Sequence, residues 1–282
     1  MTVVRKGYPK QMSDTIVVKV GGGEGVNLDT VCRDVAALVA EGEPVVLVHG
    51  GSHQTNVVSE KMGIPPKFVT SVSGHTSRYT DQATLDIFTM VYAGQVNKRI
   101  VEKLQGLGCN AVGLSGADGR LMTGPRKDAI KIIDEEGRRR MLRDDYTGKV
   151  ARVNGDLLRL LLSGGYTPVV CPPALSDNNE LINVDGDRAA AAIAAAVGAD
   201  SLIILSNVPG LLRNFPDPTS LVTRIPKAEV DDYMVYAEGR FKKKVLGAAE
   251  ALNEGVGRIV LADSRVEEPI RAAMAGQGTV IE

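Results

Sequence analysis

Two glycine-rich segments that follow apolar runs are the first feature of this sequence that could do chemistry. One run ends in Lys19-Val20 and continues into Gly21-Gly22-Gly23, and a second ends in His49 and continues into Gly50-Gly51. Glycine has no Cβ, so its backbone N–H groups can approach an oxyanion, and a following helix points its positive end at the same place. One glycine pair alone is more simply a turn, but the same arrangement after two runs favours a phosphate site.

Lysines near these segments could meet such an anion. Lys19 lies within an otherwise apolar run, where a lysine loses hydration unless an anion meets it, although its ammonium could also extend past the strand end into water. Lys242, Lys243 and Lys244 begin an amphipathic helix. Successive helical residues are rotated by about 100°, so these three cannot all face one way, and at least one is an ordinary solvated lysine.

Three polar residues stand just before an alanine-rich run, Ala189 to Val197: they are Asn183, Asp185 and Asp187. Any of them could cap the helix that this run predicts, and for two of the three capping is the simpler interpretation.

Two other nucleotide motifs are absent from the sequence. The dinucleotide fingerprint needs a small residue where Val26 stands, and no G-x-x-x-x-G-K-[ST] occurs. A standard Rossmann dehydrogenase and a P-loop NTPase are therefore excluded.

Apolar runs alternate with helical patterns along the chain, which predicts an α/β fold with a mainly parallel sheet covered on both faces. Helices are expected over 28–38, with Asn27 as N-cap, and from about 80 to 105. Polar, turn-rich stretches at 118–150, 172–187 and 212–226 are candidate walls of a site, because ligands of such sheets lie beyond the carboxyl ends of the strands. The predicted strands are Thr15–Val20, Pro44–Val48, Ala111–Leu114, Thr167–Cys171, Leu202–Leu205 and Arg258–Ala262.

Composition excludes several classes of protein. The 33 Lys and Arg against 34 Asp and Glu leave a formal net charge of −1, so no field along the chain could hold nucleic acid or an anionic membrane. The longest apolar run is far shorter than the roughly 18–20 residues of a membrane span. Three scattered cysteines and no apolar leader segment predict a reduced, cytoplasmic protein without disulfides and without a metal held by cysteines.

Six motifs, in order, resemble those of the amino acid kinase family, and they cover nearly the whole chain from Thr15. They are Val18-Lys19-Val20-Gly21-Gly22, His49-Gly50-Gly51, Arg78 ahead of Thr80-Asp81, Asn183-Val184-Asp185-Gly186-Asp187, Leu205-Ser206-Asn207-Val208-Pro209-Gly210 and the Lys244-Val245 helix start. The resemblance implies an open αβα sandwich on a mainly parallel, continuous sheet. It implies an N-terminal lobe, 1–184, for the acyl acceptor and for dimerisation, and a C-terminal lobe, 185–282, for ATP.

The resemblance also implies a reaction, transfer of the γ-phosphoryl of ATP, with Mg²⁺, to a side-chain carboxylate. A carboxylate is already ionised at neutral pH and needs no general base, but the anionic charge of the transferring group needs compensation. The implied catalytic residues are Lys19, Lys244 and Asp187, the last holding both lysines. Gly50, Gly51, Arg78 and Asn183 would bind the acceptor, and ATP would meet Lys19, Gly21, Gly22, Gly23, Ser206, Asn207, Gly210, Leu211 and Lys244.

Within the family, the chain is most similar to kinases that act on 2-aminoadipate carried by a small acidic amino-group carrier protein in lysine biosynthesis. The residues that carry this similarity are Tyr92 to Lys98, Asp145 to Gly148, Cys171 to Ser176 and Gly239 to Lys244. Glutamate on the same carrier, for arginine synthesis, stays open, because one methylene is worth only about 1–3 kcal/mol.

A basic segment, Arg120–Arg143, has eight basic and four acidic residues and is either a solvated β-hairpin or the surface that docks this carrier. The docking candidates are Arg120, Arg126, Lys127, Arg138, Arg139, Arg140 and Arg143. A homodimer is implied by the resemblance, with Phe88, Met90, Val91 and Tyr92 of the long helix as candidate interface; plain core is the equal alternative.

Three other functions compete with this interpretation. N-acetylglutamate kinase would share the fold and the lysines but act on a free substrate. A nucleotide-sensing or carrier-binding module would lack turnover, which the presence of both lysines and Asp187 disfavours. An unrelated oxidoreductase is disfavoured by the missing third glycine.

Overall fold

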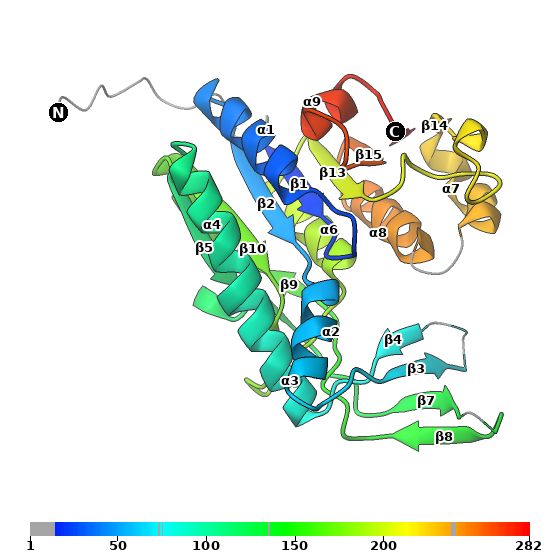
Figure 1. Cartoon of the computed structure of the whole chain (residues 1–282). Coiled ribbons are helices and arrows are strands. Elements are labelled where there is room, and N and C mark those ends of the chain that lie inside the picture. The colour runs from blue at the N-terminus through cyan, green and yellow to red at the C-terminus, as the bar shows by residue number, and fades with distance from the viewer. Residues whose placement is uncertain (1–14, 73, 75, 135, 238–240) are drawn as a thin grey trace.

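The computed structural model describes residues 15–72, 74, 76–134, 136–237 and 241–282. Its centre is an eight-stranded sheet in the order β14-β16-β15-β13-β1-β2-β10-β5, parallel except where β15 meets β16 (Figure 1). The strands are β1 (Ile16–Val20), β2 (Val45–His49), β5 (Ala111–Ser115), β10 (Thr167–Cys171), β13 (Ser201–Ser206), β14 (Arg224–Ile225), β15 (Arg258–Asp263) and β16 (Thr279–Ile281). All six predicted strands are present, within one residue at each end.

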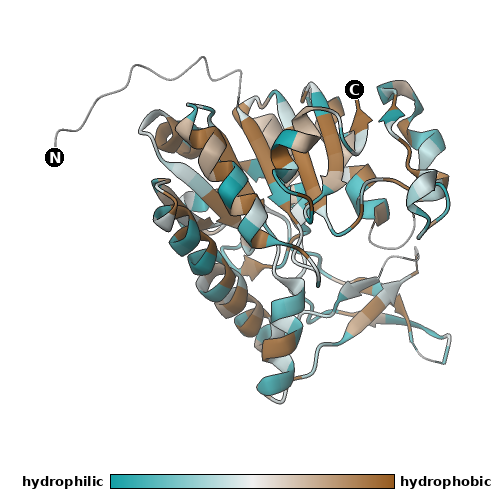
Figure 2. Cartoon of the chain, turned by 45° about the horizontal axis from the view of Figure 1, so that its top comes forward, coloured by the Kyte–Doolittle hydropathy of each residue, from teal (hydrophilic) through white to brown (hydrophobic). Residues whose placement is uncertain are grey.

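Helices cover both faces of this sheet, and alternate residues of each strand enter two separate cores. In β1, Ile16 and Val18 pack toward α1, α4 and α9, whereas Val17 packs with α5, α6 and α8. The strands are therefore apolar along their length (Figure 2). The α-helices are α1 (Leu28–Ala40), α2 (Ser52–Lys61), α3 (Gln82–Thr89), α4 (Asn97–Gly106), α5 (Gly155–Ser163), α6 (Gly186–Val197), α7 (Val230–Tyr233), α8 (Phe241–Asn253) and α9 (Pro269–Met274). The open αβα sandwich predicted from the sequence is confirmed.

The helix expected over 80–105 is present but not uniform. Helices α3 and α4 are joined by a π-helical segment, Met90–Val96. Phe88, Val91 and Tyr92 are buried in the core of this chain, whereas Met90 is 51% exposed. Most of the candidate dimer surface therefore contributes to the core, and the homodimer stays a prediction.

Two small sheets extend from the carboxyl end of the main sheet. One has the order β12-β11-β6-β9 and the other β4-β3-β7-β8, which projects at the lower right of Figure 1. Their strands are β3 (Phe68–Ser71), β4 (Thr76–Arg78), β6 (Met122–Gly124), β7 (Ile130–Ile133), β8 (Arg139–Leu142), β9 (Arg152–Val153), β11 (Ala174–Ser176) and β12 (Leu181–Ile182). The polar stretch 118–150 thus contributes strands to both sheets.

Short 3-10 turns complete the described structure, at Asp118–Arg120, Pro218–Ser220, Lys227–Glu229 and Met234–Tyr236. The four strands that follow residue 184 form one half of the main sheet, and the four that precede it form the other, so the sheet is continuous from one half to the other. The division of ligands between two lobes stays a prediction. No helix among the described residues is long and apolar enough to cross a membrane. The three cysteines are buried and unpaired.

Candidate active site

The two glycine loops interlock at the carboxyl end of β1 and β2. A Cβ on Gly22 would lie 2.0 Å from the backbone nitrogen of Gly51, so the approach of the two loops requires glycine at this position. The Ser52 hydroxyl and the His53 backbone N–H both donate to the Gly22 carbonyl, at 3.0 and 2.8 Å. Gly23, by contrast, has open space where its Cβ would be. The loops also line a cavity of about 240 Å³ beside α4, whose lining residues do not include Lys19, Asp187 or Lys244.

Lys19, Asp187 and Lys244 meet at the same edge of the sheet, although they are far apart in sequence. The ammonium of Lys19 lies 2.5 Å from one oxygen of Asp187, and that of Lys244 lies 3.2 Å from the other. All three side chains are at most 12% exposed. The structure therefore brings the three predicted catalytic residues together as one carboxylate between two lysines.

Charge and burial act against each other in this group. Burial alone would raise the pKa of Asp187, but the two lysines outweigh it and hold that pKa far below its usual range. For Lys244, burial lowers the pKa, and Asp187 offsets part of that effect. The group has one positive charge in excess, which suits it to an anionic, transferring phosphoryl.

Backbone structure near residue 186 explains why Asp187 is available to the lysines. Asp185 is the N-cap of α6 and accepts from the backbone N–H groups of Asp187 and Arg188. Asp187 then lies in the first turn of α6, and Gly247 of α8 packs against its backbone. Of the three polar residues before this helix, Asp185 is thus the cap. Lys242 is exposed, which confirms that at least one lysine of its run is solvated.

The two predicted acceptor-binding side chains are linked through Thr80. Asn183 donates to the Thr80 hydroxyl at 3.0 Å, and that hydroxyl donates to the Arg78 carbonyl at 3.1 Å. The guanidinium of Arg78 donates to Asn56 and to the Ser52 carbonyl. The sequence analysis did not predict Asn56 as a residue of the site, because no sequence motif marks this position of α2. Acceptor binding by Gly50, Gly51, Arg78 and Asn183 stays a prediction.

The loop that follows β13, predicted to bind ATP through Asn207, Gly210 and Leu211, is fixed in place by close packing against other parts of the chain. A Cβ on Gly210, whose φ is +155°, would lie 2.6 Å from the Thr279 hydroxyl, which accepts from the Leu211 backbone N–H. Leu211 is 1% exposed, and the Asn207 side chain donates to the Glu24 carbonyl at 3.2 Å. Gly210 and Leu211 therefore shape this loop, and contact of the loop with ATP stays a prediction.

Several cations of the basic segment already have partners within the chain. Arg138 and Arg140 both pair with Asp134, and Arg126 pairs with Glu180 while its guanidinium lies 3.7 Å from the Tyr146 ring centroid. Arg120 donates to Asn179. Lys127, Lys131, Arg139 and Arg143 form no ion pair with a described residue. The β-hairpin expected as one alternative is present as β7 and β8.

A model of the amino acid kinase family matches residues 14–263. The chain belongs to the amino acid kinase family. It is 57% identical over 266 residues to the "[LysW]-aminoadipate kinase" of Deinococcus radiodurans, covering 94% of this chain and 91% of that protein. It is 56% identical to the protein of the same name from Thermus thermophilus, and the alignment covers 94% of this chain and 99% of that protein. This chain is therefore a phosphotransferase.

Solved structures with the same fold are more distant in sequence. The N-acetylglutamate synthase of Neisseria gonorrhoeae aligns with a TM-score of 0.74 at 24% identity, over 95% of this chain and 59% of that one. A carbamate kinase from Giardia aligns with a TM-score of 0.67 at 15% identity, over 95% of this chain and 98% of that one. At these identities the likeness concerns the fold alone. The motif residues Gly239 and Arg240 lie outside the described residues.

Proposed function

We propose that this chain transfers the γ-phosphoryl of ATP to the side-chain carboxylate of 2-aminoadipate attached to a small acidic carrier protein, giving an acyl phosphate. The observation that carries the proposal is the Asp187 carboxylate held between Lys19 and Lys244, at 2.5 and 3.2 Å, beside two interlocked glycine loops. The names of relatives at 56–57% identity support the substrate. Relatives at 37–41% identity that are named for both aminoadipate and glutamate on the carrier keep glutamate as a second acceptor.

The proposed role of each residue in the reaction follows from the charge of its side chain. Lys19 and Lys244 compensate the anionic charge on the transferring phosphoryl and the leaving group, and Asp187 positions both ammonium groups. Arg78 and Asn183 hold the carboxylate end of the acceptor that does not react, where a guanidinium can bind in a bidentate manner. Among the described residues no group of three acidic, histidine or cysteine side chains could hold a metal ion. We therefore propose that Mg²⁺ arrives with ATP, bound to phosphate oxygens.

For the carrier, we propose docking on one face of the β4-β3-β7-β8 sheet. In the β7–β8 register, Lys131 pairs with Met141 and Ile133 pairs with Arg139, so these four side chains share a face. Ile133 is 41% exposed and Met141 49%, and Lys131 and Arg139 are exposed beside them. Exposed apolar side chains next to cations suit an acidic protein partner. The cytoplasmic location of this chain stays a separate prediction.

The deciding experiment is ATP-dependent acyl-phosphate formation, trapped with hydroxylamine. We would compare carrier protein bearing C-terminal aminoadipate, carrier protein bearing glutamate, and free N-acetylglutamate. Turnover on the carrier is expected, and Lys19→Ala or Lys244→Ala should lower kcat by at least about 10² because both act on transition-state charge. Turnover on N-acetylglutamate alone would establish the free-substrate alternative, and silence on all three would favour a sensing module.

A further inference from the structure

A buried histidine, His49, adjoins the Gly50–Gly51 loop and has no role in the proposed chemistry. It is the last residue of β2, and its side chain is inaccessible to solvent. Burial lowers the pKa of His49 to about 4, so the ring is neutral at pH 7 and carries one N–H. Its Nδ1 lies 2.9 Å from the Gly50 carbonyl oxygen, and its Nε2 lies 3.1 Å from the side-chain nitrogen of Asn97. The partners of the two nitrogens decide which of them carries the hydrogen.

The carboxamide of Asn97, the first residue of α4, has one orientation that satisfies its neighbours. The ammonium of Lys98 can only donate, and it lies 3.0 Å from the Asn97 oxygen. The Val169 carbonyl can only accept, and it lies 3.0 Å from the Asn97 nitrogen. The second hydrogen of that nitrogen is then left for Nε2 of His49. Nε2 therefore accepts, and the ring hydrogen is on Nδ1, which donates to the Gly50 carbonyl.

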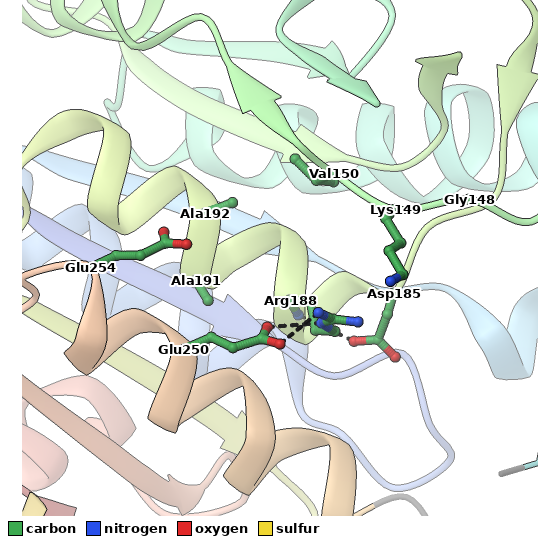
Figure 3. Close-up of a pocket in the computed structure, with 9 residues that line it drawn as sticks. All are labelled: Gly148, Lys149, Val150, Asp185, Arg188, Ala191, Ala192, Glu250 and Glu254. Carbon is green, nitrogen blue, oxygen red and sulfur yellow. Dashed lines mark hydrogen bonds and ion pairs between the residues drawn. The ribbon is translucent and has the colours of Figure 1, made fainter. Parts of the chain in front are cut away.

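Burial makes this pattern of donors and acceptors obligatory. His49 and Asn97 are both 0% exposed, so water cannot replace a missing partner. The charged cavity of about 220 Å³ between α6, α8 and the segment 148–150 differs in this respect (Figure 3). Its Arg188–Glu250 pair is 44% and 42% exposed, so water can compensate either partner. No such substitute exists at His49, and a change at Asn97 must therefore change the ring.

The surrounding backbone is shaped to admit this chain of hydrogen bonds. A Cβ on Gly113 of β5 would overlap the Asn97 oxygen, so this position requires glycine. In the π-helical segment Met90–Val96, the Asn97 backbone N–H donates to the Tyr92 carbonyl, five residues back. Residues five apart are separated by about 140° around an α-helix, and i→i+5 bonding brings them closer to one face. Asn97 thus reaches His49, while the Tyr92 ring lies against Gly51, 3.1 Å from where a Cβ would be.

We propose that His49 is a positioning residue for the acceptor, and that Asn97 holds it in the tautomer with its hydrogen on Nδ1. The Nδ1–H fixes the Gly50 carbonyl, and because a peptide unit is planar, it fixes the whole Gly50–Gly51 peptide. With the hydrogen on Nε2 instead, Nδ1 and the carbonyl oxygen would be two acceptors 2.9 Å apart and would repel each other. The tautomer therefore decides whether the loop keeps its shape.

The effect on the reaction rests on the proposed function, and it reaches the acceptor through α2. Gly51 is the N-cap of α2, so the Gly50–Gly51 peptide sets where that helix begins. The Ser52 carbonyl and the Asn56 side chain of α2 accept from the guanidinium of Arg78, which is proposed to bind the acceptor. Loss of the Nδ1–H bond should therefore raise the KM for the acceptor and leave the KM for ATP nearly unchanged.

Two amide variants separate the roles of the two ring nitrogens. In His49→Asn the new amide nitrogen can stand where Nδ1 stands, whereas in His49→Gln the longer amide reaches the place of Nε2 and leaves the Gly50 carbonyl without a donor. Both variants remove the ring, so they share any general loss of packing. With carrier protein bearing C-terminal aminoadipate, His49→Gln should raise the acceptor KM at least about tenfold and the ATP KM less than about twofold. His49→Asn should recover most of the wild-type acceptor KM, and equal acceptor KM values in the two variants would overturn the positioning role.

Side-chain ¹⁵N NMR of the full chain reads the tautomer without substrate, so failure of this assignment and failure of the proposed function are distinguishable. The chain has three histidines, and the signals lost in His49→Asn identify those of His49. At pH 7 the wild-type ring should be protonated on Nδ1 and not on Nε2, and a hydrogen on Nε2 would overturn the proposal.

Asn97→Asp tests the role of the carboxamide by the same spectra. The new carboxylate, ionised beside Lys98, can only accept, so Nε2 of His49 should become protonated. The matched control is Asn110→Asp at an exposed position before β5, which should leave the ring and the acceptor KM unchanged. An Nε2 that stays unprotonated in Asn97→Asp would refute control of the tautomer by Asn97.

Discussion

Asp187→Asn is the most informative single change, because it removes the one carboxylate between two buried lysines while keeping the shape of the side chain. The wild-type contacts are 2.5 Å to Lys19 and 3.2 Å to Lys244, and the side chains are nearly inaccessible to solvent. Removing one partner of a buried ion pair typically costs about 3–5 kcal/mol. We expect the free energy of unfolding to fall by about 3 kcal/mol, which lowers Tm by roughly 6–12 °C in a chain of this size.

The kinetic consequence separates a positioning role from a nucleotide-binding role. Without Asp187 the two ammonium groups repel each other and leave their working positions, so kcat should fall by about 10², or about 2.7 kcal/mol. The KM for ATP should not rise, since the positive charge that meets the phosphates has lost its internal counter-ion. A raised KM with unchanged kcat would refute this reasoning.

A pH profile adds a readout that a general loss of structure would not move. Burial lowers the pKa of Lys244, and Asp187 partly restores it. In Asp187→Asn that restoring effect is lost, so the alkaline fall in kcat/KM, which reports the free enzyme, should begin at lower pH than in the wild type. The matched control is Asp29→Asn, which breaks an exposed pair with Lys103, and it should change stability by less than about 1 kcal/mol and leave the profile alone.

Three further predictions follow from particular contacts. Gly22→Ala should abolish activity or folding, because its Cβ would clash with Gly51, whereas Gly23→Ala should retain kcat; equal effects in an acyl-phosphate assay would contradict the interlocked loops. Burial lowers the pKa of His49 to about 4, so the unfolded chain binds more protons below pH 6.5, and unfolding free energy should fall by about 2 kcal/mol from pH 7.5 to pH 5. Urea titrations check this, and a His49→Gln variant with the same slope would refute it. Lys131→Glu with Arg139→Glu should lower kcat/KM on carrier-bound substrate at least about tenfold and flatten its salt dependence, while Arg33→Glu on α1 should not.

The sequence by itself determined the layers of the fold and the order of its strands along the chain. Runs such as Val45–His49 are apolar at every position because both faces of a parallel sheet are covered, and that pattern is local. Asn27 was identifiable as a cap for the same reason, since its side chain bonds to N–H groups two and three residues ahead. The ordered motifs indicated the family, and with it the reaction.

Tertiary structure decided how distant charges meet. The residues around Lys19 do not show that its partner stands 168 residues later, because that contact depends on how β1 and α6 pack, and only the family resemblance indicated Asp187. The same applies to the basic segment, where Asp134 pairs with both Arg138 and Arg140, a contact that a count of charges does not show. The cavity between α6 and α8 was also invisible, because its lining comes from three segments brought together by helix packing. Local pattern reports burial, whereas the pairing of distant charges depends on a geometry that exists only after the chain has folded.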